Sequence, residues 1–343
     1  MHEPLPRRSA AATFAQQHFL HRDYETRSRA ILKNVGTHRY AADPSTEIQC
    51  VAFAVDDGPV QLWLPGNPLP PEFLYAALDP TWIVVAHNDS FETAIEQHVL
   101  APQFGWPLIP IERHRCTMAM SLAAGLPARL SAAADALELA NRKDAAGERL
   151  MHQTSKPRRA RQDEDPAGTF WYDDPERLDR LYAYCRQDVE VERELYTRLS
   201  PLPSDERAIW ALSSTINERG FCVDRKFAEA ARTIAQAAAP EIDQELATIT
   251  GGAVSGINQI TRLQTWLTDQ GYPIKKLDRK SIEKLLLDPE LPPQVPRVLE
   301  LRLGGAQAAV KKIDALLARA GNDDRVRGAF RYHGASGTLR LPL

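Results

Sequence analysis

The stretch TWIVVAHNDSFE, residues 81–92, decides the fold that this sequence predicts. Its first part, TWIVVAH, is a continuous apolar run, which is typical of a strand buried within a sheet. Residues 90–100 then carry apolar side chains at helical spacing. A buried strand that leads directly into a helix predicts an α/β layer.

Three strands are expected before this stretch. Residues 17–25 are strand-like, and CVAFAV (50–55) and VQLWL (60–64) flank the turn-forming sequence DDGP (56–59). Two short apolar runs around such a turn predict a β-hairpin. The chain therefore is expected to begin with three antiparallel strands.

Helical patterns dominate the rest of the chain. In the first half they cover residues 130–139 and 175–199, and Asp173 and Asp174 are candidate caps for the second helix. The sequence SPLPS (200–204) then breaks the pattern. Further helices are predicted at 204–219, 226–250, 259–270, 279–287 and 294–320, the last broken at Gly304 and Gly305.

This organisation predicts two domains, as expected for 343 residues. The boundaries that we predict are a flexible N-terminus at 1–15, an α/β domain at 16–202, a helical domain at 203–320 and an irregular tail at 321–343.

The composition limits the possible functions. Forty-two basic and 45 acidic residues give a net charge of −3, which excludes a uniformly basic nucleic-acid binder but not a local basic patch. The four cysteines (Cys50, Cys116, Cys185, Cys222) form no Cys-x-x-Cys pair, which argues against a thiolate zinc site and a disulfide framework. No stretch suits a signal peptide or a membrane span, so we predict a cytoplasmic protein without a membrane partner.

Two carboxylates stand at the end of the first predicted strand. Asp23 and Glu25 are two residues apart, so they project from one face about 7 Å from each other and could share divalent cations. A merely solvated face is the alternative. Glu92 follows the buried strand near a helix N-terminus, where compensation of the helix dipole is the alternative role. Asn88 could equally be a turn or cap residue.

A third polar pair lies in the long helix at 175–199. Tyr184 and Asp188 are four residues apart, so they stack on one helical face and can point into the same cleft. A half-buried tyrosine and a surface aspartate would be the ordinary alternative.

Together the motifs DYET (23–26), HNDSFE (87–92) and YCRQD (184–188) resemble those of the DEDD superfamily of 3′–5′ exonucleases, in the subgroup with a tyrosine in its last motif. The resemblance implies an RNase H-like (DnaQ-like) α/β fold with a mixed sheet flanked by helices. It implies two Mg²⁺ or Mn²⁺ ions held by Asp23, Glu25, Glu92 and Asp188. It also implies that Tyr184 orients the attacking water.

One position departs from the family pattern. Residue 92 is Glu where the family usually has Asp, and the extra methylene lengthens the reach by about 1.5 Å. Asp89, three residues earlier, is the alternative ligand.

Substrate contacts are predicted in two places. The first group belongs to the motifs and comprises Thr26, His87, Asn88 and Phe91. The second belongs to residues 141–162, where seven basic residues against two acidic ones give a net charge of +5. Its predicted contacts are Arg142, Lys143, Lys156, Arg158 and Arg159. A solvated loop is the alternative for this basic run.

Residues 204–331 resemble the thumb of family A DNA polymerases. The resemblance rests on INERGFCVD (216–224), INQITRLQTWL (257–267), LRLGGAQAAVKKIDALL (301–317) and RVRGAFRYHGAS (325–336). It implies a grip on primer–template DNA, with Lys311 and Lys312 as candidate contacts or as solubility residues. The sequence GTLRLPL after Ser336 departs from the family and leads to no palm, so we expect a truncated polymerase without nucleotide polymerisation.

The sequence thus predicts a metal-dependent, proofreading-type 3′–5′ exonuclease that acts on single-stranded DNA or DNA 3′ ends. An exoribonuclease is the nearest enzymatic alternative, because the same motifs occur in RNA-trimming enzymes. A non-catalytic DNA-binding remnant of a polymerase is the alternative from another class.

Overall fold

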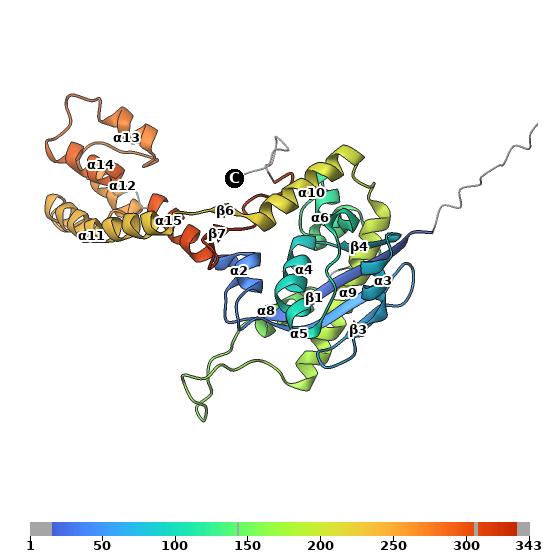
Figure 1. Cartoon of the computed structure of the whole chain (residues 1–343). Coiled ribbons are helices and arrows are strands. Elements are labelled where there is room, and N and C mark those ends of the chain that lie inside the picture. Colours follow the sequence, from blue (N-terminus) through green and yellow to red (C-terminus); the bar gives the residue numbers. More distant parts are fainter. Residues whose placement is uncertain (1–15, 143, 305–307, 335–343) are drawn as a thin grey trace, which may run out of the picture. The chain divides into compact units, whose positions relative to one another are not determined.

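A computed structural model describes residues 16–142, 144–304 and 308–334 (Figure 1). The contacts within the chain divide these residues into two units, the first formed by 16–221 with 327–334 and the second by 222–326. The predicted flexible N-terminus lies outside the described residues. No helix in the described ranges is both long and apolar enough to cross a membrane.

A five-stranded sheet forms the centre of the first unit, in the order β3-β2-β1-β4-β5. Its strands are β1 (His18–Arg27), β2 (Glu47–Val55), β3 (Gln61–Trp63), β4 (Trp82–Ala86) and β5 (His114–Cys116). The first three pair antiparallel, whereas β4 is parallel to β1 and β5 is parallel to β4. The predicted mixed sheet is confirmed, but β5 was not predicted, because it has only three residues and no apolar run.

Helices lie on both faces of this sheet (Figure 1). The long helix α9 (Pro175–Arg198) packs on β1 and β2, where Cys185 and Val189 meet Cys50, Ala52 and Ala54 of β2. Asp174 caps α9 by accepting a hydrogen bond from the Arg177 amide, as predicted. On the opposite face, α3 (Pro71–Leu78) and α4 (Asp89–Ile95) contribute to a separate core.

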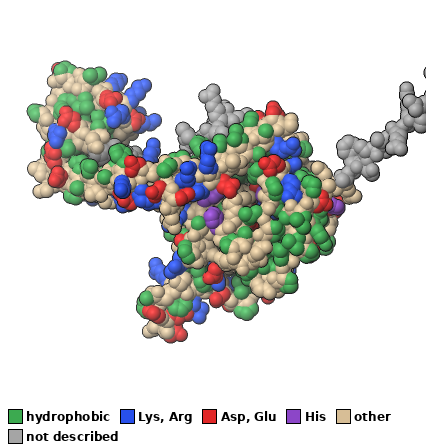
Figure 2. Space-filling view, viewed as in Figure 1, with side chains coloured by type: hydrophobic (Ala, Val, Ile, Leu, Met, Phe, Trp, Pro, Cys, Tyr) green, Lys and Arg blue, Asp and Glu red, His purple; other side chains and the backbone are tan. Residues whose placement is uncertain are grey.

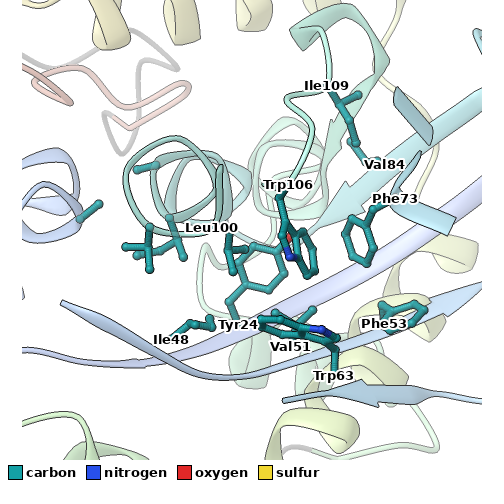
Figure 3. Close-up of a cluster of buried hydrophobic side chains, with 14 of the residues drawn as sticks. Tyr24, Ile48, Val51, Phe53, Trp63, Phe73, Val84, Leu100, Trp106 and Ile109 are labelled. Atoms are coloured by element: carbon teal, nitrogen blue, oxygen red, sulfur yellow. The ribbon is translucent and has the colours of Figure 1, made fainter. Parts of the chain in front are cut away.

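Aromatic side chains fill that second face (Figure 3). The Trp106 ring lies 4.2 Å from the Phe73 ring and 5.2 Å from the Trp63 ring, measured between centroids. Tyr24 of β1 meets Trp106 edge to face, with centroids 6.3 Å apart. These buried rings fix which side of β1 faces the core.

The helix predicted at 90–100 changes type partway along. α4 ends at Ile95, and a π-helix, η1 (Glu96–Leu100), continues into α5 (Ala101–Phe104). The wider turn begins at Glu96, whose buried carboxylate bonds to side chains of β1.

The remaining elements of the first unit are short, apart from α10 (Ser204–Arg219) and α8 (Ala145–Thr154). They are α1 (Leu32–Val35), α2 (Thr37–Ala41), η2 (Ile111–Arg113), α6 (Thr117–Ala123) and α7 (Leu130–Ala136). The basic run at 141–162 is partly helical, since α8 lies within it. Asp144 caps this helix by accepting a hydrogen bond from the Ala146 amide at 3.0 Å.

The prediction began the second domain at residue 203, whereas contacts group α10 with the first unit. Trp210 of α10 packs with Cys116, Ala119 and Tyr332, all of the first unit.

The second unit is mainly helical. Its helices are α11 (Arg225–Ile249), α12 (Ile260–Asp269), α13 (Arg279–Leu285), α14 (Gln294–Gly304) and α15 (Ala308–Arg319). They lie where the apolar spacing predicts them, and buried leucines such as Leu246, Leu263 and Leu299 form their core.

One short pair of strands adds to the expected, almost wholly helical domain and to the tail expected after residue 320. β6 (Phe221–Cys222) pairs with β7 (Arg325–Val326), and the Val223 amide donates to the Asp324 carbonyl at 2.8 Å. Two residues are too few to give a strand signal in the sequence. The end of the predicted tail, 335–343, lies outside the described residues.

Candidate metal and nuclease site

The side chains of β1 alternate between the two faces of the sheet. Arg22 and Tyr24 face the side of α4 and the aromatic core. His21 faces α9, where its Nδ1 donates to Glu192 at 2.7 Å, and Asp23 and Glu25 follow on the same side. The two predicted ligands of β1 thus point toward the helix that carries the third motif.

The third motif lies buried on α9. Tyr184 is 1% exposed, Cys185 is 0% exposed and Asp188 is 4% exposed. Burial, and then the charges of Asp188, Glu25 and Asp23, raise the pKa of the Tyr184 phenol far above its ordinary range. Cys185 Sγ of α9 lies 3.5 Å from Asp23 Oδ2 of β1, so the structure brings the first and third motifs together.

Glu92, in the first turn of α4, belongs to the same group. Burial and the charge of Asp23 raise the pKa of its carboxyl well above the ordinary value. Its Oε2 is buried and accepts no hydrogen bond from the described residues. We name Asp23, Glu25, Glu92 and Asp188, with Tyr184 and Cys185, the carboxylate cluster.

This cluster fits a divalent cation. Ligand atoms of Asp23, Glu25 and Cys185 lie within 4.8 Å of one another. Gathering acidic groups in a buried place is costly unless protons or cations neutralise them, and the raised pKa of Glu92 reports that cost. Carboxylate oxygens are the ligands that Mg²⁺ and Mn²⁺ prefer.

Asp89, the alternative metal ligand to Glu92, is surrounded by hydrogen-bond donors. It accepts hydrogen bonds from Arg22 Nη2 at 3.0 Å and from His114 Nδ1 at 2.9 Å. Burial opposes its ionisation, but His114 and Arg22 outweigh burial, so the pKa of Asp89 is lowered. Its carboxylate is thus committed to an internal ion pair, whereas that of Glu92 is not.

Arg22 organises this second group, which the sequence patterns did not reveal. Its Nε donates to Glu96 Oε1 at 2.8 Å, and the Tyr24 hydroxyl donates to the same oxygen at 2.6 Å. Burial lowers the pKa of Arg22, yet Glu96 and Asp89 raise it by more. We name Arg22, Tyr24, Asp89, Glu96 and His114 the arginine cluster.

Gly147 of α8 is a further residue that sequence reasoning missed. A Cβ atom built at this position would lie 2.4 Å from Cδ2 and 2.9 Å from Cγ of Tyr184. The ring of Tyr184 therefore packs directly on the α8 backbone. The cap residue Asp144 was a visible sign of this helix, but the ring contact had no local signal.

The predicted substrate residues of the motifs mostly bond within the protein. The Thr26 hydroxyl lies 2.9 Å from the Tyr40 hydroxyl, and His87 Nε2 donates to the Ala128 carbonyl at 2.8 Å. Phe91 is half-buried with its ring centroid 6.2 Å from that of Tyr40. Their roles toward a substrate stay predictions.

Asn88 precedes α4 and accepts a hydrogen bond from the Ser90 hydroxyl at 3.1 Å. It also lines a cavity of about 70 Å³ in the first unit, together with Trp210, Asn217 and Phe330. This cavity is large enough for a few water molecules.

The predicted basic contacts divide into two kinds. Arg142 donates to Asp135 at 2.7 Å, and Arg158 forms a two-pronged ion pair with Glu164, both bonds at 2.6 Å. Lys156 and Arg159 are exposed in the same segment. Lys143 lies outside the described residues. Of the predicted basic contacts that the structure describes, Arg142 and Arg158 are engaged in ion pairs, and Lys156 and Arg159 are exposed.

In the second unit, Lys and Arg side chains gather on the surface near α13 (Figure 2). The exposed ones between residues 275 and 284 are Lys275, Lys276, Arg279, Lys280 and Lys284. Lys312 of α15 is also exposed, and the surroundings of the Lys311 side chain lie outside the described part.

No protein-family model matches the sequence. The chain is 34% identical over 325 residues to a protein named DNA polymerase from Bacillus phage SP02. The match covers 93% of this chain and 49% of the phage protein, so the chain spans about half the length of that polymerase.

Among solved structures, the chain resembles the POL domain of Pol1 from M. smegmatis, solved in complex with DNA primer-template and dNTP. The TM-score is 0.54 at 14% identity, over 95% of this chain and 50% of that one. NrnC of Brucella melitensis matches 59% of this chain and 82% of its own, with a TM-score of 0.29 at 17% identity. A nuclease in its apo form matches 59% of this chain and 81% of its own, with a TM-score of 0.27 at 18% identity. Sequence thus relates the chain to a phage DNA polymerase, and structure relates its fold to a polymerase domain.

Proposed function

We propose that this protein is a divalent-metal-dependent exonuclease that removes nucleotides from DNA 3′ ends. The observation that carries the proposal is the convergence of the carboxylate cluster from β1, α4 and α9 in one buried place. The proposed RNase H-like fold of the first unit and the proposed 3′–5′ direction of digestion rest on the resemblance of the three motifs to DEDD exonucleases.

Asp23, Glu25, Glu92 and Asp188 are the residues that would hold the metal ions. When bound, such ions activate water and neutralise the charge on the leaving 3′ oxygen. Burial and the charge of Asp23 raise the pKa of the Glu92 carboxyl, and a bound cation would favour its ionised form. The donor atoms of the site are therefore carboxylate oxygens, which suit a divalent cation.

Tyr184 would orient the attacking water. Its pKa is raised by burial and by three neighbouring carboxylates, so the phenol keeps its proton at neutral pH. A protonated phenol can donate a hydrogen bond and hold a water in place, but it cannot act as a general base.

DNA is the substrate that the similarity favours. The 34% identical relative is named a DNA polymerase. The exposed Lys156 and Arg159 of the first unit are proposed to contact phosphates of the strand being digested. The basic residues near α13, with Lys311 and Lys312, are proposed to grip a duplex.

The test uses the full chain with a 5′-labelled single-stranded DNA and Mg²⁺ or Mn²⁺. We expect a ladder of shortened products from the wild-type protein, and its loss in Asp23→Ala. Asp57→Ala is the matched control, because Asp57 is an exposed carboxylate in the β2–β3 turn. Equal digestion by Asp23→Ala and wild type would overturn the proposal.

Two further arms separate the alternatives. Faster digestion of an RNA of the same sequence would indicate an exoribonuclease. Binding of DNA without digestion would indicate a non-catalytic module. We propose no accompanying polymerase activity, and extension of a primed template with dNTPs would contradict that part.

A further inference from the structure

Cys185 is the member of the carboxylate cluster to which the proposed hydrolysis gives no role. Its sulfur lies 3.5 Å from Oδ2 of Asp23 and 3.4 Å from the Asp23 carbonyl oxygen. Ligand atoms of Cys185, Asp23 and Glu25 all lie within 4.8 Å of one another. A thiol thus stands among the carboxylates that we propose for hard metal ions.

The spacing matches the coordination geometry of a softer ion. In a tetrahedral zinc site, a Zn–S bond of about 2.3 Å and a Zn–O bond of about 2.0 Å place the two ligand atoms about 3.5 Å apart. The Cys185 thiol donates a hydrogen bond to Asp23 Oδ2 over a sulfur–oxygen distance of 3.5 Å, so a cation that replaced the thiol proton would meet both atoms at this spacing. The two donors are therefore already placed as neighbouring ligands.

Glu92 gives an independent sign of a cation at this place. It is 5% exposed, and its Oε2 is buried without a hydrogen bond from the described residues. Among charged groups, Asp23 acts most strongly on Glu92. A buried carboxylate oxygen that accepts no hydrogen bond is costly, and a bound cation would remove that cost.

We propose that Cys185, Asp23 and Glu25 form a binding site for a thiophilic divalent cation, Zn²⁺ or Cd²⁺. On binding, the S–H bond breaks, a sulfur–metal bond forms and the proton passes to solvent, with no change of oxidation state. The inference deepens the proposed function, because the soft ion takes the carboxylates that the hard ions need. Zn²⁺ and Cd²⁺ are thus inhibitors held by the thiolate.

The first experiment titrates the metal-free full chain with Cd²⁺ and follows the ultraviolet charge-transfer band of a cadmium–thiolate bond. We expect the wild-type protein to bind an ion with this band. Cys185→Ser should lose the band and weaken binding by about tenfold or more. Cys116→Ser is the control for a buried thiol, and Cys222→Ser is the control for the exposed one. A band that persists in Cys185→Ser would overturn the proposal.

A second measurement needs no variant and covers the case that Cys185→Ser does not fold. X-ray absorption of the wild-type protein loaded with one equivalent of Zn²⁺ reports the donor atoms directly. A sulfur together with oxygens in the first shell supports the proposal, and a shell of oxygen and nitrogen alone contradicts it.

The nuclease assay separates this inference from the proposed function. If both hold, Zn²⁺ inhibits digestion supported by Mn²⁺, and Cys185→Ser requires about tenfold more Zn²⁺ for the same fractional inhibition of its own activity. A Cys185-dependent cadmium band in a protein without nuclease activity would retain the metal site and reject the proposed function. Digestion of DNA by a protein that shows no cadmium–thiolate band would support the proposed function and reject the thiophilic metal site.

Discussion

The arginine cluster and the carboxylate cluster both include residues of β1 that are neighbours in sequence, but they differ in how their buried charges are balanced. In the arginine cluster, two nitrogens of Arg22 bond to the carboxylates of Asp89 and Glu96, so buried charges of opposite sign meet. In the carboxylate cluster, acidic groups meet each other and a thiol. The first arrangement pairs its buried charges internally, and the second is the site that we propose for metal ions.

Asp89 and Glu92 show this difference most directly. Both are buried in the first turn of α4, three residues apart. The pKa of Asp89 is lowered because His114 and Arg22 overcome the effect of burial, whereas the pKa of Glu92 is raised by burial and by Asp23. The surroundings, rather than the residue type or the helix, decide which carboxylate is available to a ligand.

The largest effect is expected from Arg22→Met. It leaves Asp89 and Glu96 buried without their main cation, so we expect the free energy of unfolding to fall by about 3–5 kcal/mol. Urea denaturation measures it. Arg142→Met is the matched control, because the Arg142–Asp135 pair is exposed and should contribute less than about 1 kcal/mol. Equal effects of the two substitutions would show that the arginine cluster is not a stabilising core.

The carboxylate cluster should respond to metal where the arginine cluster does not. At a free Mn²⁺ concentration about 100 times the dissociation constant, we expect stabilisation by about 2.7 kcal/mol. Thermal unfolding with and without Mn²⁺ measures this gain. Asp23→Ala should lose most of it and Asp57→Ala should keep it. A gain that both variants keep would locate the ion elsewhere.

Gly147→Ala tests how tightly the carboxylate cluster is held. The added methyl would overlap the Tyr184 ring, so we expect a loss of roughly 2 kcal/mol in stability and a lower kcat. Gly304→Ala is the control, because none of the atoms in the described residues lies within 4 Å of a Cβ there. A fully active Gly147→Ala protein would mean that the exact position of Tyr184 does not limit the reaction.

The smallest change in the free energy of unfolding is expected from Glu92→Gln in the metal-free protein. This change is a gain, whereas Arg22→Met causes a loss. A carboxyl with a raised pKa in the folded state binds more protons than it does unfolded, so stability falls as pH rises above about 4.5. The neutral amide avoids this loss. We therefore expect Glu92→Gln to be more stable than wild type by about 1 kcal/mol at pH 8, and less so toward pH 4.5.

Asp89→Asn supplies the contrast for that measurement. Because the pKa of Asp89 is lowered, its ionised form contributes stability above about pH 3.8, and this contribution is lost as pH falls through and below that value. Chemical denaturation across this range should show the two variants differing from wild type in opposite directions. The same direction for both would remove the distinction between the clusters.

The sequence predicted those features that depend on local patterns. The alternation of β1 placed Asp23 and Glu25 on one face, and Asp174 with Pro175 marked the start of α9. The apolar run of β4 identified the centre of the sheet.

Features that depend on distant pairs had no such pattern. Arg22 and Glu96 are 74 residues apart, and Gly147 meets Tyr184 only after α8 packs on α9. No local pattern predicts a contact between Cys185 and Asp23, because their proximity depends on how β1 and α9 pack. The site residues were therefore predictable one by one, but their surroundings were not.

The alternation along β1 also limits how this protein can evolve. β1 already has a register shift between Glu25 and Thr26 in its pairing with β2. A single residue inserted or deleted before Arg22 without a compensating bulge would turn Asp23 and Glu25 toward the aromatic core and Arg22 toward α9. The packing of the aromatic core and the proposed metal site would both be disrupted by that one change. Up to Glu25, a change in the length of β1 therefore requires a bulge that restores the register.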